Sequence, residues 1–268
     1  MRKAYLETNA ICRAEDYGIS GCDLRLRLEH NGLTPVVGLH VIYELARTFL
    51  NPKNTDTAIR LFRIVEELSP EYSEQPGALI TQEVDRCLNN SDIAPFLDGA
   101  DFNAAVDEVQ KLSTGNFDDK ARGFIEGRDS NFQREHEIIA KINIEEFRRN
   151  FLIMRIRTFE DVLSYYENDF STLLIKIFNG KLSRAEALNI LDVIDTLHTI
   201  QSRLRSEIYL LFIALVHGAV PNTDKVDDHR HIIEAAYCDV FITGDSQLIN
   251  NANKINPNIE IMELNSLL

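Results

Sequence analysis

The chain has 268 residues, of which 44% are hydrophobic, and a formal net charge of −14 at pH 7. This length can bury a sizeable core in one or two domains. The negative charge excludes a general electrostatic attraction to nucleic acid or to an anionic membrane, although a local basic groove or a bound cation can override it at one site. The longest apolar run, residues 208–220, is shorter than the ~20 residues that span a bilayer. We therefore expect no membrane association.

The cysteines and the first residues indicate a compartment. The four cysteines have no CxxC spacing, which is typical of reduced thiols and does not favour a cysteine zinc site. A strand-like segment and an acid directly follow the basic residues at positions 2 and 3, so no signal-peptide pattern is present. These features predict a cytoplasmic protein.

The two ends of the chain alternate strand and helix patterns. The apolar run at 240–242 suits a buried central strand, and residues 259–264 alternate as an edge strand does. In order, the sequence predicts a strand at 4–6, a helix at 20–30, a strand at 35–38, helices at 41–49 and 55–68, a helix beginning at Asp228, a strand at 240–242, a helix at 246–253 and a strand at 259–264.

The middle of the chain has a different pattern. Residues 69–82 contain two prolines and a glycine and predict a loop, whereas 131–150 and 158–178 predict helices. Ser183 and Glu186 have capping-box spacing, and the apolar residues from Leu188 to Leu215 then recur every three or four positions. This stripe predicts one continuous helix of about eight turns. We therefore predict an α/β domain with a parallel sheet at residues 1–68 and 222–268, interrupted by an all-helical insertion at 69–221.

Four acids occupy comparable places in the predicted α/β part. Glu7 and Asp245 each follow a strand, Glu44 lies in the helix after the second strand, and Asp228 opens the late helix. Strand ends of a parallel sheet share one edge, so these side chains can converge. Carboxylates ~5 Å apart repel by about 3 kcal/mol per pair at an effective dielectric of ~20, so such a cluster needs cations. Oxygen ligands suit Mg²⁺ or Mn²⁺. Taken singly, each acid is more typical of a solvated surface residue or a helix cap than of a metal site.

These segments resemble a known family. Leu6-Glu7-Thr8-Asn9 is similar to the strand-one motif of PIN-domain nucleases, and Tyr43-Glu44-Leu45 resembles their helix acid. The segments from Asp228 to His231 and from Thr243 to Asp245 resemble the closing motif of that family, with its two acids about 17 residues apart. The resemblance covers roughly the first 65 and the last 45 residues.

The resemblance implies a cytoplasmic endonuclease that hydrolyses phosphodiester bonds, of RNA more than of single-stranded DNA, with Mg²⁺ or Mn²⁺. It gives Glu7, Glu44, Asp228 and Asp245 the catalytic and metal-binding roles. Four further residues would support them, as groups that orient ligands, replace Asp228 or contact phosphate: Asn9, Asp227, His231 and Thr243.

This chain departs from the family at position 7, where Glu7 replaces an aspartate. The additional methylene displaces the carboxylate, and metal sites are sensitive to such displacements. The pattern therefore indicates either a retuned site or a weakened one. A second interpretation of the sequence is a binding or scaffold protein. Its core would be catalytically weakened, and the helical insertion would form the surface that binds a partner.

The same sequence is compatible with other partners and other classes of protein. A strand-guiding groove is one interpretation of Arg148, Arg149, Arg155 and Arg157 with Phe147, Phe151 and Phe159, and a solvated helical face is the other. A homodimer or an inhibitory protein partner is compatible with the sequence. A haloacid dehalogenase-type phosphatase is a weaker alternative, because Thr243-Gly244-Asp245-Ser246 resembles its late metal loop but no aspartate nucleophile follows the first strand.

Overall fold

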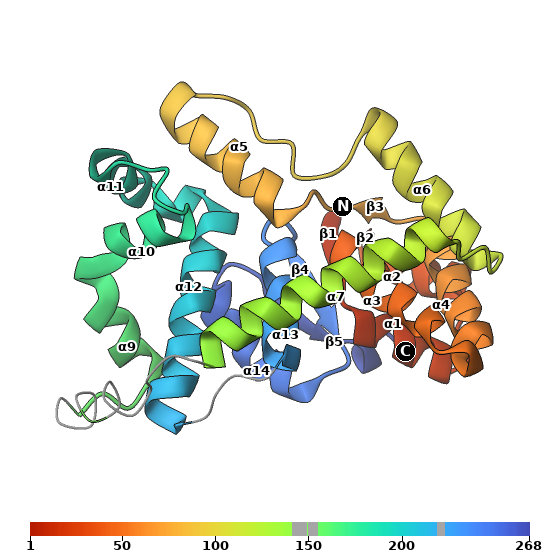
Figure 1. The fold of residues 1–268 in the computed structure, drawn as a ribbon. Helices are drawn as coiled ribbons and strands as arrows, with labels where there is room; N and C mark the ends of the chain where they lie inside the picture. The colour runs from red at the N-terminus through yellow and green to blue at the C-terminus, as the bar shows by residue number, and fades with distance from the viewer. Residues whose placement is uncertain (141–148, 150–154, 219–222) are drawn as a thin grey trace.

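The computed structural model describes residues 1–140, 149, 155–218 and 223–268. The described residues form a five-stranded parallel sheet flanked by helices (Figure 1), as the sequence predicted for the α/β class. The strand order is β3-β2-β1-β4-β5. The strands are β1 (Arg2–Leu6), β2 (Leu33–Val37), β3 (Glu71–Tyr72), β4 (Val240–Thr243) and β5 (Glu260–Glu263).

The strand order places a reversal between β1 and β4. From β1 the chain moves outward to β2 and β3, and then returns to the other side of β1 to form β4 and β5. Tyr5 pairs with Phe241 and Leu6 with Ile242, so β1 and β4 end level with each other. In open parallel sheets, ligands bind beyond the carboxyl ends of the strands at this kind of reversal. This edge is where Glu7 and Asp245 lie.

The helices before the middle segment build the β1–β2 side. The first of them was not predicted, although Ala10, Ile11 and Ala14 give it an apolar face. The helix predicted at 55–68 is confirmed. These helices are α1 (Thr8–Asp16), α2 (Gly21–His30), α3 (Leu39–Arg47) and α4 (Thr55–Leu68).

The helices of the middle segment lie around both sides of the sheet (Figure 1). α7 crosses in front of the sheet and contacts α3 and α13, whereas α6 packs on α4. The middle helices are α5 (Pro76–Asn89), α6 (Gly99–Ser113), α7 (Asp119–Ala140), α9 (Phe159–Tyr166), α10 (Phe170–Ile177), α11 (Arg184–Asp192) and α12 (His198–Phe212), and those near the C-terminus are α13 (Thr223–Glu234) and α14 (Ser246–Ile255).

The predicted boundary at residue 68 is too early. Residues 71 and 72, within the predicted loop, form β3 and pair with Val36 and Val37 of β2. The main core also runs through the middle segment, because Val109, Phe159 and Leu204 belong to the same buried cluster as the strands. A second, smaller apolar cluster joins α10, α11 and the start of α12. Much of the middle segment therefore packs as part of the α/β body.

Two helix predictions are corrected. α13 begins at Thr223, so Asp228 lies inside the helix and does not cap it. The stripe from Leu188 to Leu215 is not one helix, although the capping box at Ser183 and Glu186 is confirmed. The chain leaves α11 after Asp192, passes a short 3₁₀ turn and starts again as α12 at His198.

A buried carboxylate explains the new helix start. Glu83 of α5 has no exposed surface, and it accepts hydrogen bonds of 2.7 Å from the amides of Thr199 and Ile200. The Tyr237 hydroxyl donates a third bond of 2.7 Å to the same side chain. An acid at a helix N-terminus satisfies amides that have no partner inside the helix. Since Glu83 lies more than 100 residues earlier in the chain, no local pattern reveals this break.

Among the described residues, none of the helices combines the length and apolar character that crossing a bilayer requires.

We predict that Glu83→Ala lowers the free energy of unfolding by about 2–4 kcal/mol, because it leaves buried amides without acceptors. Chemical denaturation followed by circular dichroism measures the change. Asp85→Ala on the exposed face of the same helix is the control and should stay within about 0.5 kcal/mol of the wild type. Equal losses in the two variants would contradict the capping role.

Candidate functional site

The reversal between β1 and β4 carries a buried carboxylate. Glu7 directly follows β1 and is 6% exposed, and its backbone amide donates to the carbonyl of Ile242 over 3.1 Å. Thr243 at the end of β4 donates its hydroxyl to Glu7 Oε2 over 3.0 Å, and the backbone amide of Asn9 donates to the same carboxylate. Burial nevertheless raises the pKa of Glu7 above its ordinary value of 4.5. Hydrogen bonds therefore fix the orientation of this carboxylate, but they do not fully offset the cost of burying its charge.

Close packing at Gly244 keeps this edge narrow. A Cβ at this position would lie 2.5 Å from Arg13 Cδ and 2.7 Å from Asn9 Oδ1. The side chains of Arg13 and Asn9, both on α1, therefore rest against the turn after β4. A side chain at position 244 would therefore require the Arg13 and Asn9 side chains to move away from this turn.

Asp228 and Asp245 form the second part of the site. Burial raises the pKa of Asp228 to about 6, and the nearby charge of Asp245 adds to the rise, while Lys225 opposes it. Lys225 Nζ lies 3.5 Å from Asp228 Oδ2. Asp245 caps α14 by accepting from the amides of Gln247 at 2.7 Å and Leu248 at 3.3 Å. Asp245 thus has both a structural role and a position beside Asp228.

Glu44 and the buried His231 form a partly buried ion pair. His231 Nε2 lies 2.8 Å from Glu44 Oε2, and the Thr8 hydroxyl donates to the same oxygen. Burial alone would lower the pKa of His231, but the charge and hydrogen bond of Glu44, with smaller effects of Glu7 and Glu234, raise it to about 9. Burial likewise opposes the ionisation of Glu44, and the His231 charge and hydrogen bond outweigh it and lower the Glu44 pKa to about 2. His231 is therefore an imidazolium at neutral pH.

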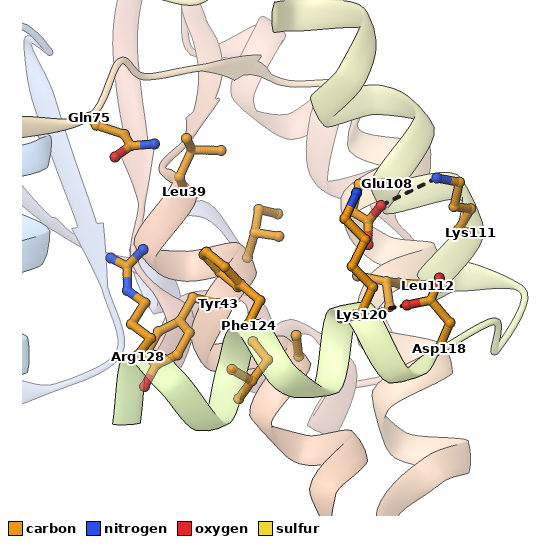
Figure 2. A pocket seen from close by; sticks show the side chains of 14 residues that line it. Leu39, Tyr43, Gln75, Glu108, Lys111, Leu112, Asp118, Lys120, Phe124 and Arg128 are labelled. Atoms are coloured by element: carbon orange, nitrogen blue, oxygen red, sulfur yellow. Dashed lines mark hydrogen bonds and ion pairs between the residues drawn. The ribbon is translucent and has the colours of Figure 1, made fainter. Parts of the chain in front are cut away.

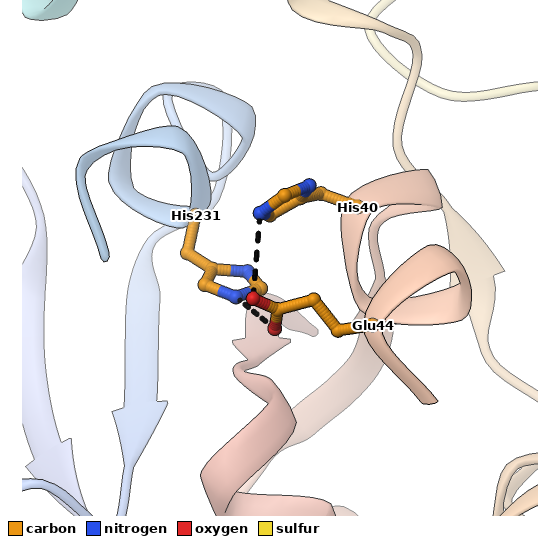
Figure 3. A group of neighbouring side chains, drawn as sticks. All are labelled: His40, Glu44 and His231. Atoms are coloured by element: carbon orange, nitrogen blue, oxygen red, sulfur yellow. Dashed lines mark hydrogen bonds and ion pairs between the residues drawn. The ribbon is translucent and has the colours of Figure 1, made fainter. Parts of the chain in front are cut away.

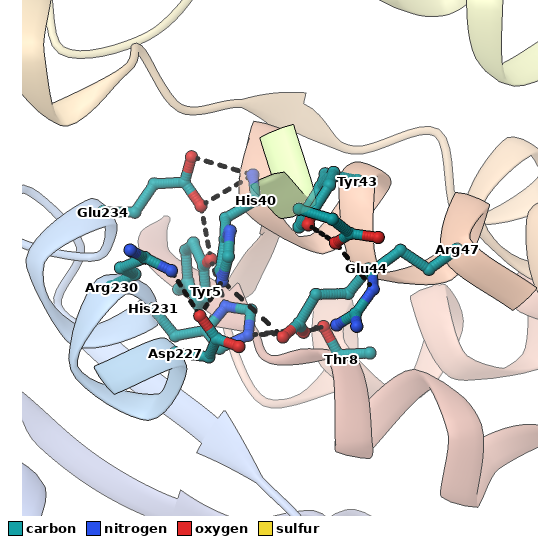
Figure 4. A network of polar contacts seen from close by, with 11 residues as sticks. Tyr5, Thr8, His40, Tyr43, Glu44, Arg47, Asp227, Arg230, His231 and Glu234 are labelled. Atoms are coloured by element: carbon teal, nitrogen blue, oxygen red, sulfur yellow. Dashed lines mark hydrogen bonds and ion pairs between the residues drawn. The ribbon is translucent and has the colours of Figure 1, made fainter. Parts of the chain in front are cut away.

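The hydrogen-bond directions agree with this assignment (Figure 4). The Tyr5 hydroxyl donates its one proton to Glu234 Oε2 over 2.7 Å, so its oxygen accepts from His231 Nδ1, which is 3.0 Å away. The other ring nitrogen of His231 faces the Glu44 carboxylate. Both nitrogens of His231 are thus donors, which requires the protonated ring.

Glu234 joins this network to α3. Its two oxygens lie 3.1 and 3.2 Å from the backbone amide of His40, in the first turn of the helix. Gly38, which precedes α3, permits the contact, because a Cβ there would lie 1.8 Å from Glu234 Oε2 and 2.6 Å from the Tyr5 hydroxyl. The acid thereby holds the start of α3 against the end of α13.

His40 is the least satisfied member of the group. Its side chain is 2% exposed, and neither ring nitrogen has a hydrogen-bond partner within the described part of the chain. Nε2 lies 3.6 Å from Glu44 Oε1 and 4.0 Å from Asp227 Oδ1. Burial, and then the charge of His231, hold the pKa of His40 well below 6.5. The ring is neutral, so these two contacts are not ion pairs.

Asp227 lies on the His40 side of the site. It forms an ion pair with Arg230 one turn along α13, and the Arg230 guanidinium packs 3.4 Å from the centre of the Phe132 ring of α7. Burial raises the pKa of Asp227, and Arg230 opposes the rise. Asp227 is thus already paired with a cation.

The predicted site residues therefore fall into two adjoining groups. Glu7, Asn9 and Thr243 meet at the β1–β4 edge, with Asp228 and Asp245 beside each other at the neighbouring helices. Glu44 and His231 pair next to them, and the charge of His231 acts on Glu7, Glu44 and Asp228 alike. Sequence reasoning missed Tyr5, Thr8, His40 and Glu234. Of these, only His40 had a local signal, since it precedes Glu44 by four residues on one helical face.

The predicted basic groove is described only in part. Phe147, Arg148 and Phe151 lie outside the described residues. Phe159 is 2% exposed and packs on Tyr209 and Phe212 in the core, so it is not a stacking surface. Arg149, Arg155 and Arg157 are exposed.

A separate pocket of ≈ 370 Å³ lies between α3, α6 and α7 (Figure 2). Leu39, Tyr43 and Phe124 line it, together with Lys120 and Arg128. Tyr43 also donates to Asp129 of α7, which forms an ion pair of 3.2 Å with Arg47. His40 and Glu44 are not among the lining residues, so the pocket is distinct from the carboxylate site.

No protein-family model, curated protein or solved structure matches this chain. The geometry of the site is therefore the basis for a functional proposal.

The ion pair predicts a pH-dependent stability in metal-free buffer. Because the pKa of His231 is raised to about 9, the pair stabilises the fold fully below about pH 6.5 and loses its effect as the pH rises through 9. Because the pKa of Glu44 is lowered to about 2, the effect is also lost as the pH falls from 4.5 through 2. We expect Glu44→Gln to cost about 3 kcal/mol near pH 6 and less at pH 9.5, as measured by urea denaturation.

Glu160→Gln on the exposed side of α9 is the control and should run parallel to the wild type. A Glu44→Gln cost that stays constant between pH 6 and 9.5 would mean that His231 is not charged in the folded state.

Proposed function

We propose that this protein is a cytoplasmic, metal-dependent endonuclease that hydrolyses phosphodiester bonds, with RNA as its preferred substrate. Glu7, Glu44, Asp228 and Asp245 would hold Mg²⁺ or Mn²⁺. The observation that carries the proposal is the placement of these carboxylates around the β1–β4 reversal, where Glu7 is buried, Asp228 is partly buried, and both have raised pKa values. Acids that lose part of their hydration at a ligand-binding edge, and whose charge is not offset by a cation, favour a cation site.

The residues present fit such an ion. Carboxylate oxygens are the ligands that Mg²⁺ and Mn²⁺ prefer. Glu7 is oriented by Thr243 and by the Asn9 amide, as an ion ligand needs to be. When bound, the ion would lower the pKa of a water molecule and stabilise the charge that develops at phosphorus.

The chain's own groups have further roles in this proposal. The imidazolium of His231 holds Glu44 in place and offsets part of the negative charge of the cluster. Arg13 beside Gly244 and Lys225 beside Asp228 place cationic side chains at the edge of the acids. A phosphate group entering between them would be attracted despite the net charge of −14. Thr8 and Thr243 supply hydroxyls that keep the acids in one orientation.

One observation favours the scaffold function as the second candidate. Glu44 is already neutralised by His231 without any ion, and Asp245 is engaged as a helix cap. A protein that had lost catalysis could keep both interactions for stability alone. Binding of Mn²⁺ and cleavage of nucleic acid separate the two functions.

We predict Mn²⁺-dependent cleavage of labelled single-stranded RNA, followed by gel electrophoresis, with slower cleavage of single-stranded DNA. Asp245→Asn should reduce the rate by about 100-fold or more, because loss of a ligand exceeds the 10–100-fold effect of the groups that orient ligands. Asp239→Asn at the other end of β4 is the matched control and should keep wild-type activity. Equal rates in Asp245→Asn and wild type would contradict the proposal.

Thermal unfolding gives a second prediction that does not depend on the substrate. At a Mn²⁺ concentration 100 times the dissociation constant, the folded wild type should gain about 2.7 kcal/mol. Differential scanning fluorimetry should register a rise in Tm for the wild type and for Asp239→Asn, and a smaller one for Glu7→Gln. An unchanged wild-type Tm, together with no cleavage, would support the scaffold function.

A further inference from the structure

A three-donor cluster lies between α3 and α13, next to the carboxylate edge (Figure 3). One donor atom from each of His40, Glu44 and His231 lies within 4.8 Å of the other two. His40 and Glu44 are four residues apart on α3, which puts both side chains on the same face of the helix. His231 faces them from α13 and comes from the other end of the sequence.

The unpartnered ring of His40 is the independent sign of a ligand. Buried polar groups are normally hydrogen-bonded, and each exception needs an explanation. His40 is 2% exposed, and its Nε2 points toward Glu44 over 3.6 Å with no hydrogen-bond partner in the described residues. His40 Nε2 is thus directed at a carboxylate and a second imidazole. An ion between these three groups could accept the lone pair of this nitrogen.

We propose that His40 Nε2, Glu44 and His231 Nε2 form a binding site for a divalent transition-metal ion, with Zn²⁺ as the ion that fits best. Two imidazoles and one carboxylate are a ligand set that zinc takes, with the fourth position left to water. Imidazole nitrogen favours zinc over Mg²⁺, which prefers oxygen. This site is therefore different in metal class from the one proposed for the four carboxylates.

The distances suit this ion after small side-chain rotations. Zinc bonds of about 2.0–2.1 Å in a tetrahedral site place ligand atoms about 3.3 Å apart. The His40–Glu44 separation is 3.6 Å and the His231–Glu44 separation is 2.8 Å, on either side of that value. On binding, the ion takes the place of the proton on His231 Nε2, which leaves to solvent.

The residues that hydrogen-bond the proposed zinc ligands already hold them in orientations that suit metal binding. Metal-bound histidines usually donate their other ring N–H to an acceptor, which fixes the orientation of the ring. His231 Nδ1 donates to Tyr5 over 3.0 Å, and Tyr5 is held by Glu234. Glu234 also binds the backbone amide of His40, so one buried acid positions both histidines.

Zinc binding at this site does not depend on the proposed nuclease function. A competition between zinc and Mn²⁺ does rest on the proposed nuclease function, because Glu44 belongs to both ligand sets. Zinc that engages Glu44 would remove it from the carboxylate cluster and weaken the binding of Mn²⁺ there. The variants His40→Gln and Asp245→Asn separate the two sites, because each changes a residue of only one of them.

Isothermal titration of the metal-free full chain with Zn²⁺ tests the proposal. We expect the wild type to bind one equivalent, and His40→Gln to weaken binding by at least about tenfold. Asp245→Asn and the exposed-histidine control His30→Gln should bind zinc as the wild type does, while Asp245→Asn loses the Mn²⁺-induced rise in Tm. A His40→Gln protein that binds zinc with wild-type affinity would overturn the proposal.

Cobalt provides a readout that needs no variant, should His40→Gln fail to fold. Co²⁺ added to the wild type should give the intense visible absorption bands of a four-coordinate site, and one equivalent of Zn²⁺ should remove them. Absence of these bands at stoichiometric Co²⁺, or their persistence with excess Zn²⁺, would overturn the site. Loss of Mn²⁺ stabilisation with zinc binding intact would remove only the proposed nuclease function.

Discussion

The buried charges between α3 and α13 are the constraint on which the site depends. Glu44 and His231 are 187 residues apart in sequence and meet at 2.8 Å. Breaking a buried pair by removing one partner costs far more than a surface pair does, because the remaining charge stays without compensation. Tyr5 and Glu234 extend the pair into a chain that ends on the backbone of His40. The first and last segments of the protein are thereby held in one arrangement.

This arrangement decides how the acids at the neighbouring strand ends behave. His231 supplies a positive charge that acts on Glu7 and Asp228 as well as Glu44, yet the pKa values of Glu7 and Asp228 remain raised by burial. The site therefore holds the cations of His231 and Arg230, but the charges of Glu7 and Asp228 are only partly offset. A hard ion at the carboxylates would offset their negative charge. A softer ion at the histidines would bind His40 Nε2, which has no hydrogen-bond partner in the described part of the chain. The shared Glu44 means that the two ions would not act independently.

The middle helices pack against the elements that carry the site. α7 lies across α3 and α13, where Phe132 packs on Arg230, and Arg230 pairs with Asp227. Glu83 of α5 caps α12 and also binds Tyr237 just before β4. Both contacts connect the long segment between β3 and β4 to the elements that carry the site. Its helices thus help to set the site's geometry as well as fill the space beside the sheet.

The sequence by itself determined the α/β class, the strands β1, β2, β4 and β5, and the helices α2, α4 and α14. Those elements follow from local periodicity and end signals, which act over a few residues. Position after a strand also singled out Glu7 and Asp245 as neighbours of one sheet edge. Only the tertiary structure decided the interruption before α12, the place of Asp228 inside α13 and the edge strand β3. It also decided the roles of Tyr5, His40 and Glu234, whose partners lie up to 229 positions away. Burial and charge compensation between distant segments control these features, and a local pattern contains no information about them.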